Sequence, residues 1–457
     1  MKRLNRTGVC QKRQRWGYLA ILFCLVLGAI ALSPTPAKSQ MANDELNQML
    51  EAGNIGGAIA EVEGDWETLF ENYFETDFPN YQRQASEIAQ LLETRYQHTQ
   101  EKAAAVWLVP LEDQLCIMLI TPGQAPRNWF NKEVSQAELT RTLNDFRNRL
   151  ILPVRRITNS YLRPSQQLYT WIIQPIESVL KSENIDSLIL CTGPGLRSLP
   201  FAALHDGEQF LIEKYSISRI PAFNLTAFED TSLNQASILA MGASEFEELD
   251  NLPAVEVELA AITPRLWPGE TLLNQDFTLE NLVLQRQKHS FEIVHLATHA
   301  AFNPGTPQNS YIQFHNERLS FDLLPDLGLD RPPVDLLVLS ACETAIGDRE
   351  AELGFAGLAI QAGVKSALAS LWRVSDAGTM ALMSEFYQQL KTAPTVAAAL
   401  RQAQIAMLNQ QVYIEANELR NSRGGLPLPE DLAAQAAREN LAHPFYWAGF
   451  SLIGSPG

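Results

Sequence analysis

Two short apolar segments, each carrying a reactive side chain near its end, constrain the fold of this chain more than any other feature. Residues 335–347 (DLLVLSACETAIG) begin as a run of β-forming residues and turn small and polar around Cys342, as a buried strand does when it opens into a loop. Residues 291–301 (FEIVHLATHAA) have the same form and carry His299. Neighbouring strands of a parallel α/β sheet end at a common edge, where ligands bind. The two segments therefore predict that a thiol and an imidazole meet at two strand ends.

Strand-like and helix-like stretches alternate along most of the remaining chain. This alternation predicts an α/β fold with a mostly parallel sheet flanked by helices. It divides the 457 residues into a leader over 1–39, a short helical N-terminal region over 40–100, a first α/β unit over 101–230 and a second α/β unit over 236–457. Within the second unit, the pattern predicts one continuous helix over 352–362 and a polar loop over 421–431.

The leader differs in composition from everything that follows it. Basic residues precede an apolar run over 17–32 that is short for a membrane span, and Ala37-Lys38-Ser39 fits the small-x-small pattern of a cleavage site. The sequence therefore predicts a secretory signal peptide and export to the periplasm or the extracellular medium. An uncleaved membrane anchor formed by residues 17–32 is the alternative.

The rest of the chain is strongly acidic. The leader holds seven of the 35 basic side chains and none of the 52 acidic ones, so the remaining residues carry a net charge of −24. Such a charge repels phosphate backbones and attracts cationic groups. The sequence therefore argues against a nucleic-acid partner and favours cationic peptides or proteins.

Three cysteines, Cys116, Cys191 and Cys342, follow the leader. Disulfide frameworks and structural zinc sites need paired, closely spaced cysteines, so neither is predicted and at least one thiol must stay free. His295 and His299 do not make a metal pair either, because four residues along a strand separate them by about 13 Å. His295 is instead predicted to lie in the core or behind the site. No metal and no cofactor are predicted.

Cys342 and His299 offer the chemistry of a nucleophile and its base. A thiolate attacks amides readily, and a neighbouring imidazole favours the thiolate and protonates the departing amine. The backbone N–H groups of Cys342 and Ala300 are expected to stabilise the oxyanion. Asp376 follows the next strand, and it is expected either to bind a lysine or arginine side chain of a peptide or to stabilise the helix that it begins. The alternative for Cys342 is a buried structural cysteine.

Several motifs in a fixed order resemble those of a known family. They are VHLATH (294–299), LSACETAIG (339–347), QAGVKSALASLW (361–372), AALRQAQ (398–404), HPFYWAGFSLIGSP (443–456) and, upstream, GLRSLPFAALHDG (195–207). Together they resemble the CHAT-domain proteins, caspase-like cysteine peptidases that are related to separase and common in cyanobacteria. The resemblance extends over about residues 105–456.

The resemblance implies a caspase-like fold in which a pseudo-caspase-like half precedes the catalytic half. It also implies that His299 and Cys342 form the catalytic dyad. Two features depart from the family pattern. Ala300 stands where caspase-like enzymes usually have glycine, and about sixty residues precede the α/β region where many relatives carry long helical repeat arrays.

Two functional hypotheses follow from the sequence. The first is a cysteine endopeptidase that cuts protein or peptide substrates after a basic residue. The second is a catalytically silent CHAT-fold module that binds a regulatory protein partner. The reactivity of Cys342 distinguishes the two.

Overall fold

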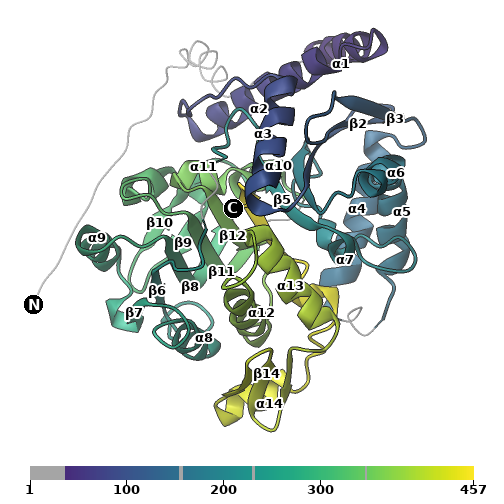
Figure 1. Ribbon diagram of the computed structural model, residues 1–457. Helices are drawn as coiled ribbons and strands as arrows, with labels where there is room; N and C mark the ends of the chain where they lie inside the picture. The colour runs from purple at the N-terminus through teal and green to yellow at the C-terminus, as the bar shows by residue number, and fades with distance from the viewer. Residues whose placement is uncertain (1–35, 154–157, 229–231, 345–346) are drawn as a thin grey trace, which may run out of the picture. The chain divides into compact units, whose positions relative to one another are not determined.

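A computed structural model describes residues 36–153, 158–228, 232–344 and 347–457 (Figure 1). The chain divides into two compact units, Met1–Gln48 and Met49–Gly457. The described residues of the first unit belong to helix α1 (Pro36–Glu51), which continues past the boundary. The predicted leader falls almost wholly outside the described residues. Within the described ranges, no helix has both the length and the hydropathy of a membrane-crossing segment.

One large sheet organises the second unit. In the described part of the chain, thirteen strands join it. From edge to edge the order is β10 (Arg318–Ser320), β9 (Tyr311–Gln313), β8 (Ile293–Phe302), β11 (Leu336–Thr344), β12 (Ser366–Ser370), β16 (Phe450–Gly454), β5 (Ser216–Ile220), β4 (Ser187–Thr192), β1 (Ala103–Pro110), β2 (Leu115–Ile120) and β3 (Arg127–Asn131), while β6 (Ile238–Gly242) pairs with β8 and β7 (Gly269–Leu273) pairs with β6.

The sheet consists of two parallel groups of strands joined through β16. Strands β7, β6, β8, β11 and β12 run parallel to one another, as do β5, β4 and β1. Strand β16 runs antiparallel to β12 and parallel to β5. The antiparallel β8–β9–β10 and β1–β2–β3 ladders extend the two groups. The predicted α/β class with a mostly parallel sheet is confirmed.

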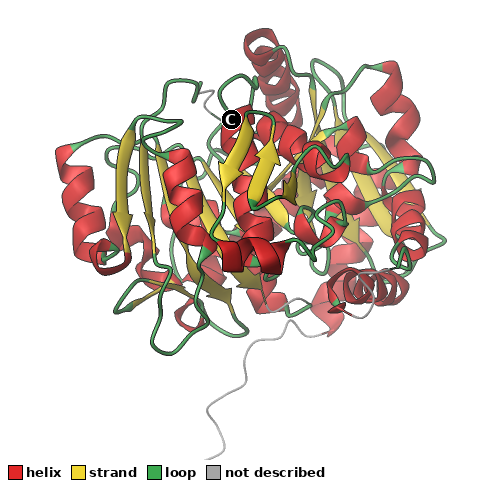
Figure 2. Ribbon diagram, turned by 90° about the horizontal axis from the view of Figure 1, so that it is seen from below, coloured by secondary structure: helices red, strands yellow, loops and turns green. Residues whose placement is uncertain are grey.

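Helices cover the sheet on both faces (Figure 2). They include α2 (Ile55–Phe74), α3 (Ala85–Thr99), α4 (Gln136–Ile151), α5 (Leu162–Ile172), α6 (Gln174–Ser182), α7 (Leu211–Lys214), α8 (Ala254–Ile262), α9 (Leu279–Lys288), α12 (Asp376–Gln389) and α13 (Val396–Leu408). Side-chain caps define several helix starts. Thr278, Ser375 and Thr395 each accept a hydrogen bond from the backbone N–H three residues later, which satisfies a donor that the first helical turn leaves unpaired.

The predicted continuous helix over 352–362 is wrong. The structure has two helices, α10 (Arg349–Ala356) and α11 (Leu358–Ala362), separated by Gly357. The aromatic ring of Phe74, at the end of α2, lies where a side chain at Gly357 would begin. Glycine therefore permits this close approach, and the helix axis breaks there.

The predicted polar loop over 421–431 is also wrong. A three-stranded antiparallel sheet forms from β13 (Tyr413–Glu415), β14 (Glu418–Asn421) and β15 (Gly424–Pro427), and α14 (Glu430–Ala436) follows it. Each strand has three or four residues, which is too few for a clear alternating pattern. Ser422 at the β14–β15 turn donates its hydroxyl to Glu385 Oε2 on α12 (2.9 Å), so a long-range contact helps to fix the hairpin.

A buried carboxylate connects the two groups of strands. Glu352 on α10 is 2% exposed. It accepts hydrogen bonds from Arg147 Nη2 on α4 (3.3 Å), from the Gly195 backbone N–H (3.1 Å) and from the Ser198 hydroxyl. Residues of the first α/β unit therefore hold the helix that follows β11.

Two further arginines are buried around the same carboxylate. Arg197 and Arg219 are 1% and 3% exposed. Burial lowers their pKa values to about 10 and about 9, although the charge of Glu352 acts in the opposite direction. Arg147 pairs with Glu352 directly, and the charges of Arg197 and Arg219 lie within its electrostatic range, so removing Glu352 would leave buried positive charge uncompensated.

Glu63 holds helix α2 against the group of strands that contains β1. This side chain is 1% exposed and accepts hydrogen bonds from Trp107 Nε1 on β1 (2.7 Å) and the Asn224 backbone N–H (2.9 Å). Burial raises the pKa of Glu63 to about 7, against the opposing effect of these two hydrogen bonds.

Candidate active site

The two segments singled out in the sequence form adjacent parallel strands, β8 and β11 (Figure 1). Their pairing is regular up to Leu339, which lies opposite Leu296. Ala341 then lies opposite His299, so β8 advances three residues while β11 advances two. This extra residue is a β-bulge, a feature that re-aims side chains and is frequent beside active sites.

The register after the bulge brings the backbones of Cys342 and His299 close together, with His299 opposite Ala341. Cys342 pairs with Ala300, and His299 is the preceding residue of β8. Adjacent strands lie about 4.8 Å apart, so the backbones of Cys342 and His299 are near neighbours. The side chain of Cys342 lies outside the described part of the structure.

The prediction that both residues stand at strand ends is only approximate. Strand β8 continues to Phe302 and β11 to Thr344, and the register continues with Ala301 opposite Glu343. The small residues after His299 can stay in the sheet because β9 pairs with them, with Ala300 opposite Ile312.

The His299 ring is half-buried and oriented by the loop between β6 and α8. Its Nε2 lies 2.8 Å from the Asp250 carbonyl oxygen. A carbonyl oxygen can only accept a hydrogen bond, so Nε2 carries the proton and the neutral ring keeps its lone pair on Nδ1. The edge of the ring also packs against Phe246, with centroids 4.9 Å apart. A base oriented by a third group is the usual arrangement in nucleophilic catalysis.

The same loop carries four acidic residues. Glu245, Glu247, Glu248 and Asp250 are all exposed, and Asp250 forms an ion pair with Arg373 (2.9 Å). This loop was not among the features predicted from the sequence to form the site. The signal available in the sequence was the run of alternating acidic and apolar residues just after a predicted strand.

Asp376 begins α12 and is half-buried. Its Oδ2 accepts a hydrogen bond from the Ala254 backbone N–H (2.6 Å), the first residue of α8. Burial raises the pKa of Asp376 to about 7, and the negative charges of Glu258 and Glu439 act in the same direction. These contacts support a role in stabilising helix ends, while substrate binding by Asp376 stays a prediction.

His295 lies in the core, in agreement with its predicted position. The ring is fully buried, with Nδ1 3.0 Å from the Tyr387 hydroxyl and Nε2 2.8 Å from Glu258 Oε1. Helices α8 and α12 supply these two partners, so the network fixes both helices to β8, four residues before His299.

Comparison with protein families shows which family the chain belongs to. A family model described as the CHAT domain matches residues 162–455, which is more than half of the chain. The chain belongs to the CHAT domain family. No curated protein matches the sequence.

Solved structures were compared with this CHAT domain as well. Two crystal structures of the Saccharomyces cerevisiae separase–securin complex, at 2.6 Å and 3.0 Å resolution, match with TM-scores of 0.49 and 0.48 and 10% sequence identity. Each match covers 93% of this chain and 34% of the matched chain. The chain thus spans about a third of the length of the chains it matches.

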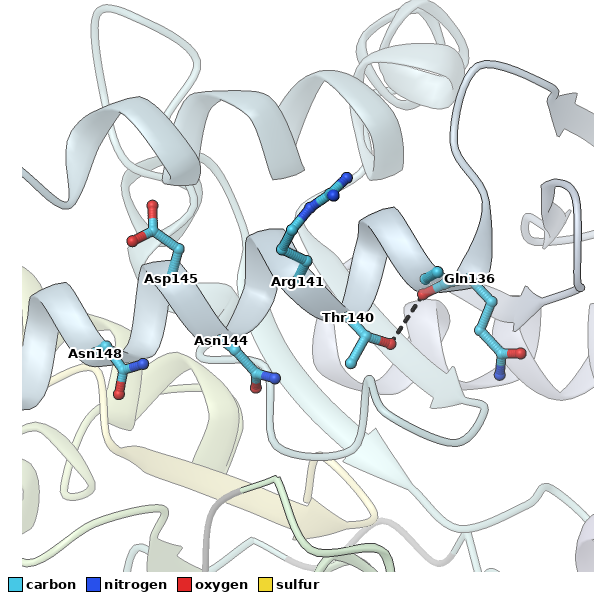
Figure 3. A pocket seen from close by; sticks show the side chains of 7 residues that line it. Gln136, Thr140, Arg141, Asn144, Asp145 and Asn148 are labelled. Carbon is cyan, nitrogen blue, oxygen red and sulfur yellow. Dashed lines mark hydrogen bonds between the residues drawn. The ribbon is translucent and has the colours of Figure 1, made fainter.

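The first α/β unit presents a polar hollow on α4 (Figure 3). Gln136, Thr140, Asn144 and Asp145 line it, and the Thr140 hydroxyl donates to the Gln136 carbonyl oxygen (2.8 Å). Its lining comes from one helix and contains neither a cysteine nor a histidine. The hollow therefore offers no nucleophile and base of its own.

The other thiols of this CHAT domain are poorly suited to catalysis. Cys116 and Cys191 are free and fully buried. Burial raises the pKa of Cys116 to about 12 and raises that of Cys191 well above its usual value. Among the described residues, no group of three or more His, Cys, Asp or Glu side chains is placed to hold a metal ion.

Proposed function

We propose that this CHAT-domain protein is a cysteine endopeptidase that cuts after a basic residue, with Cys342 as nucleophile and His299 as base. The observation that carries the proposal is the adjacency of β8 and β11, which brings the backbones of His299 and Cys342 within one register position of each other. The hydrogen bond from His299 Nε2 to the Asp250 carbonyl supports it, because that bond leaves Nδ1 as the basic nitrogen.

In the proposed reaction, His299 Nδ1 takes the proton of the Cys342 thiol, and the sulfur attacks the carbonyl carbon of the scissile bond. The C–N bond then breaks, and the imidazolium gives its proton to the departing amine, which leaves a thioester. Water attacks the thioester as His299 removes one of its protons. The C–S bond breaks, the carboxylic acid leaves and the sulfur recovers a proton.

The oxyanion of each tetrahedral intermediate needs hydrogen-bond donors at fixed positions. We expect the backbone N–H groups of Cys342 and Ala300 to supply them. Ala300 is 4% exposed and is held in the sheet by strands on both sides. Alanine in place of glycine restricts the local backbone here.

The preference for a basic residue rests on charge. The exposed carboxylates of Glu245, Glu247 and Glu248 belong to the loop that contacts His299, and a lysine or arginine of a peptide is attracted to such a cluster. Asp376 is the second candidate for this contact.

Cleavage of peptide libraries containing arginine or lysine tests the proposal directly. Cys342→Ala and His299→Ala should each lower kcat/KM by about a thousandfold or more. His289→Ala is a matched control, because His289 is exposed at the end of α9, and it should cleave like the wild type. Equal turnover by the wild type and Cys342→Ala would reject the mechanism.

A thiol-reactive peptide probe separates the peptidase from the silent interaction module. The peptidase hypothesis expects covalent labelling at Cys342 that slows in His299→Ala. A folded protein with an inert Cys342 would favour the module.

Export is a separate proposal, and mass spectrometry of the mature N-terminus tests it, since an intact Met1 would contradict removal of the leader.

A further inference from the structure

A small cavity lies between helix α12, the end of α8 and the β14–β15 hairpin. Its volume is about 40 Å³, which is room for about three water molecules. Ser384 and Gln388 of α12 form one wall, Arg265 lies beyond the end of α8, and Arg423 with Gly424 closes it from the hairpin. The cavity therefore lies where the β14–β15 hairpin meets α12 and α8.

The lining of this cavity is positively charged in an otherwise acidic molecule. Arg265 and Arg423 are among the nine lining residues, and no lining residue is acidic. Neither arginine forms an ion pair with a carboxylate of the described residues. Lys391 adds a third cation nearby, since burial and the positive charge of Arg423 both lower its pKa.

The Ser384 hydroxyl, a hydrogen-bond donor without an acceptor among the described residues, also lines the cavity. Ser384 is 3% exposed, and within the described part of the chain its hydroxyl has no hydrogen-bond partner. A buried hydroxyl without a partner costs about 1–3 kcal/mol, so such groups usually meet a ligand or water. The exposed guanidinium groups are the planar donors that suit carboxylate and phosphate oxygens best.

The nearby carboxylates are already engaged. Glu385 Oε2 accepts hydrogen bonds from the Ser422 backbone N–H (3.2 Å) and hydroxyl (2.9 Å), and its Oε1 accepts one from Gln389 (2.6 Å). Glu418 is paired with Arg420 on its own strand (2.7 Å). These pairs leave Arg265 and Arg423 as the cations available to a ligand.

From these contacts we infer that the cavity is a binding site for a small oxyanion, of which inorganic phosphate and a carboxylate are the two candidate sources. Arg265 and Arg423 bind the anion from opposite sides, and the Ser384 hydroxyl donates to it. The bound anion joins the hairpin to α8 and α12, in addition to the hydrogen bonds of Ser422 with Glu385. This inference is independent of any catalysis at Cys342.

Isothermal titration calorimetry of the full chain with inorganic phosphate, and separately with acetate, tests the inference in chloride buffer. Arg423→Ala and Arg265→Ala should each weaken binding of the preferred anion about tenfold or more, since each removes a charge-assisted hydrogen bond. Arg420→Ala is the matched control on the same hairpin, because Arg420 is paired and does not line the cavity. It should bind like the wild type.

Ser384→Ala distinguishes a ligand contact from surface charge alone. It should weaken binding severalfold while the far-UV circular dichroism spectrum stays unchanged. The relative strength of the phosphate and acetate titrations identifies the source of the oxyanion. Absence of binding to the wild type for both anions would overturn the inference. Binding that survives the Arg265→Ala/Arg423→Ala double substitution would also overturn it.

Discussion

Replacement of Glu352 by leucine is the sharpest test of how the two groups of strands are joined. The substitution removes the acceptor of Arg147, Ser198 and the Gly195 N–H at once. Breaking a buried ion pair by removing one partner costs about 3–5 kcal/mol. Because Arg147 keeps its hydrogen bond to the Ser198 carbonyl oxygen (3.1 Å), we expect a loss of about 4 kcal/mol in the free energy of unfolding.

Urea unfolding followed by tryptophan fluorescence measures this loss. Glu350→Gln is the control, because Glu350 is exposed on the same helix, and a surface substitution should stay within about 0.5 kcal/mol of the wild type. The double substitution Arg147→Met/Glu352→Leu should recover part of the stability, since it removes the unpaired charge together with its partner. A loss below about 1 kcal/mol for Glu352→Leu would refute the reasoning. So would a double variant whose loss equals the sum of the losses of the two single variants.

Four further predictions concern the surroundings of the site and of α2. The Glu63 carboxyl ionises near pH 4.5 in the unfolded chain and near 7 in the folded one, so its contribution to the free energy of unfolding should fall by about 3 kcal/mol as the pH rises through that window. Glu63→Gln should remove this decline in urea titrations between pH 4.5 and 8, and an unchanged pH profile would contradict the assignment. Tyr387→Phe leaves His295 Nδ1 without its partner and should cost about 1–3 kcal/mol in the same assay; no loss would show that the hydroxyl is dispensable. In Gly242→Ala the new methyl carbon would lie 2.5 Å from the Ala297 carbonyl oxygen. We therefore expect the free energy of unfolding to fall by about 1–3 kcal/mol and the labelling of Cys342 to slow. Wild-type stability and labelling would mean that β6 and β8 adjust freely. Asp376→Ala should lower the free energy of unfolding by about 1 kcal/mol, because it removes the acceptor of the Ala254 N–H. If Asp376→Asn also raised the KM for arginine substrates, Asp376 would have a role in substrate binding as well.

The sequence predicted the parallel strands well because their composition is distinctive. The runs around Val294 and Leu337 are nearly all apolar, as strands buried on both faces are. The starts of α9 and α12 carry a local signal as well, because Thr278 and Ser375 are side chains that cap a helix. These signals are local, so a single sequence carries them.

The features that the sequence did not predict depend on contacts between distant residues. The residue at the Gly357 break lies against Phe74 of another helix, and the hairpin at Ser422 is held by Glu385. The bulge between β8 and β11 is a property of the pairing of two strands. The orientation of His299 by the Asp250 carbonyl likewise needed the fold, because a backbone carbonyl has no sequence signature.

The central place of β16 has a consequence for biosynthesis. Residues 450–454 lie between β12 and β5, yet a ribosome makes them after every other strand of the sheet. Until they emerge, both neighbours present unpaired backbone groups, which are prone to associate with other chains. The two groups of strands therefore lack their shared central strand until residues 450–454 have been made.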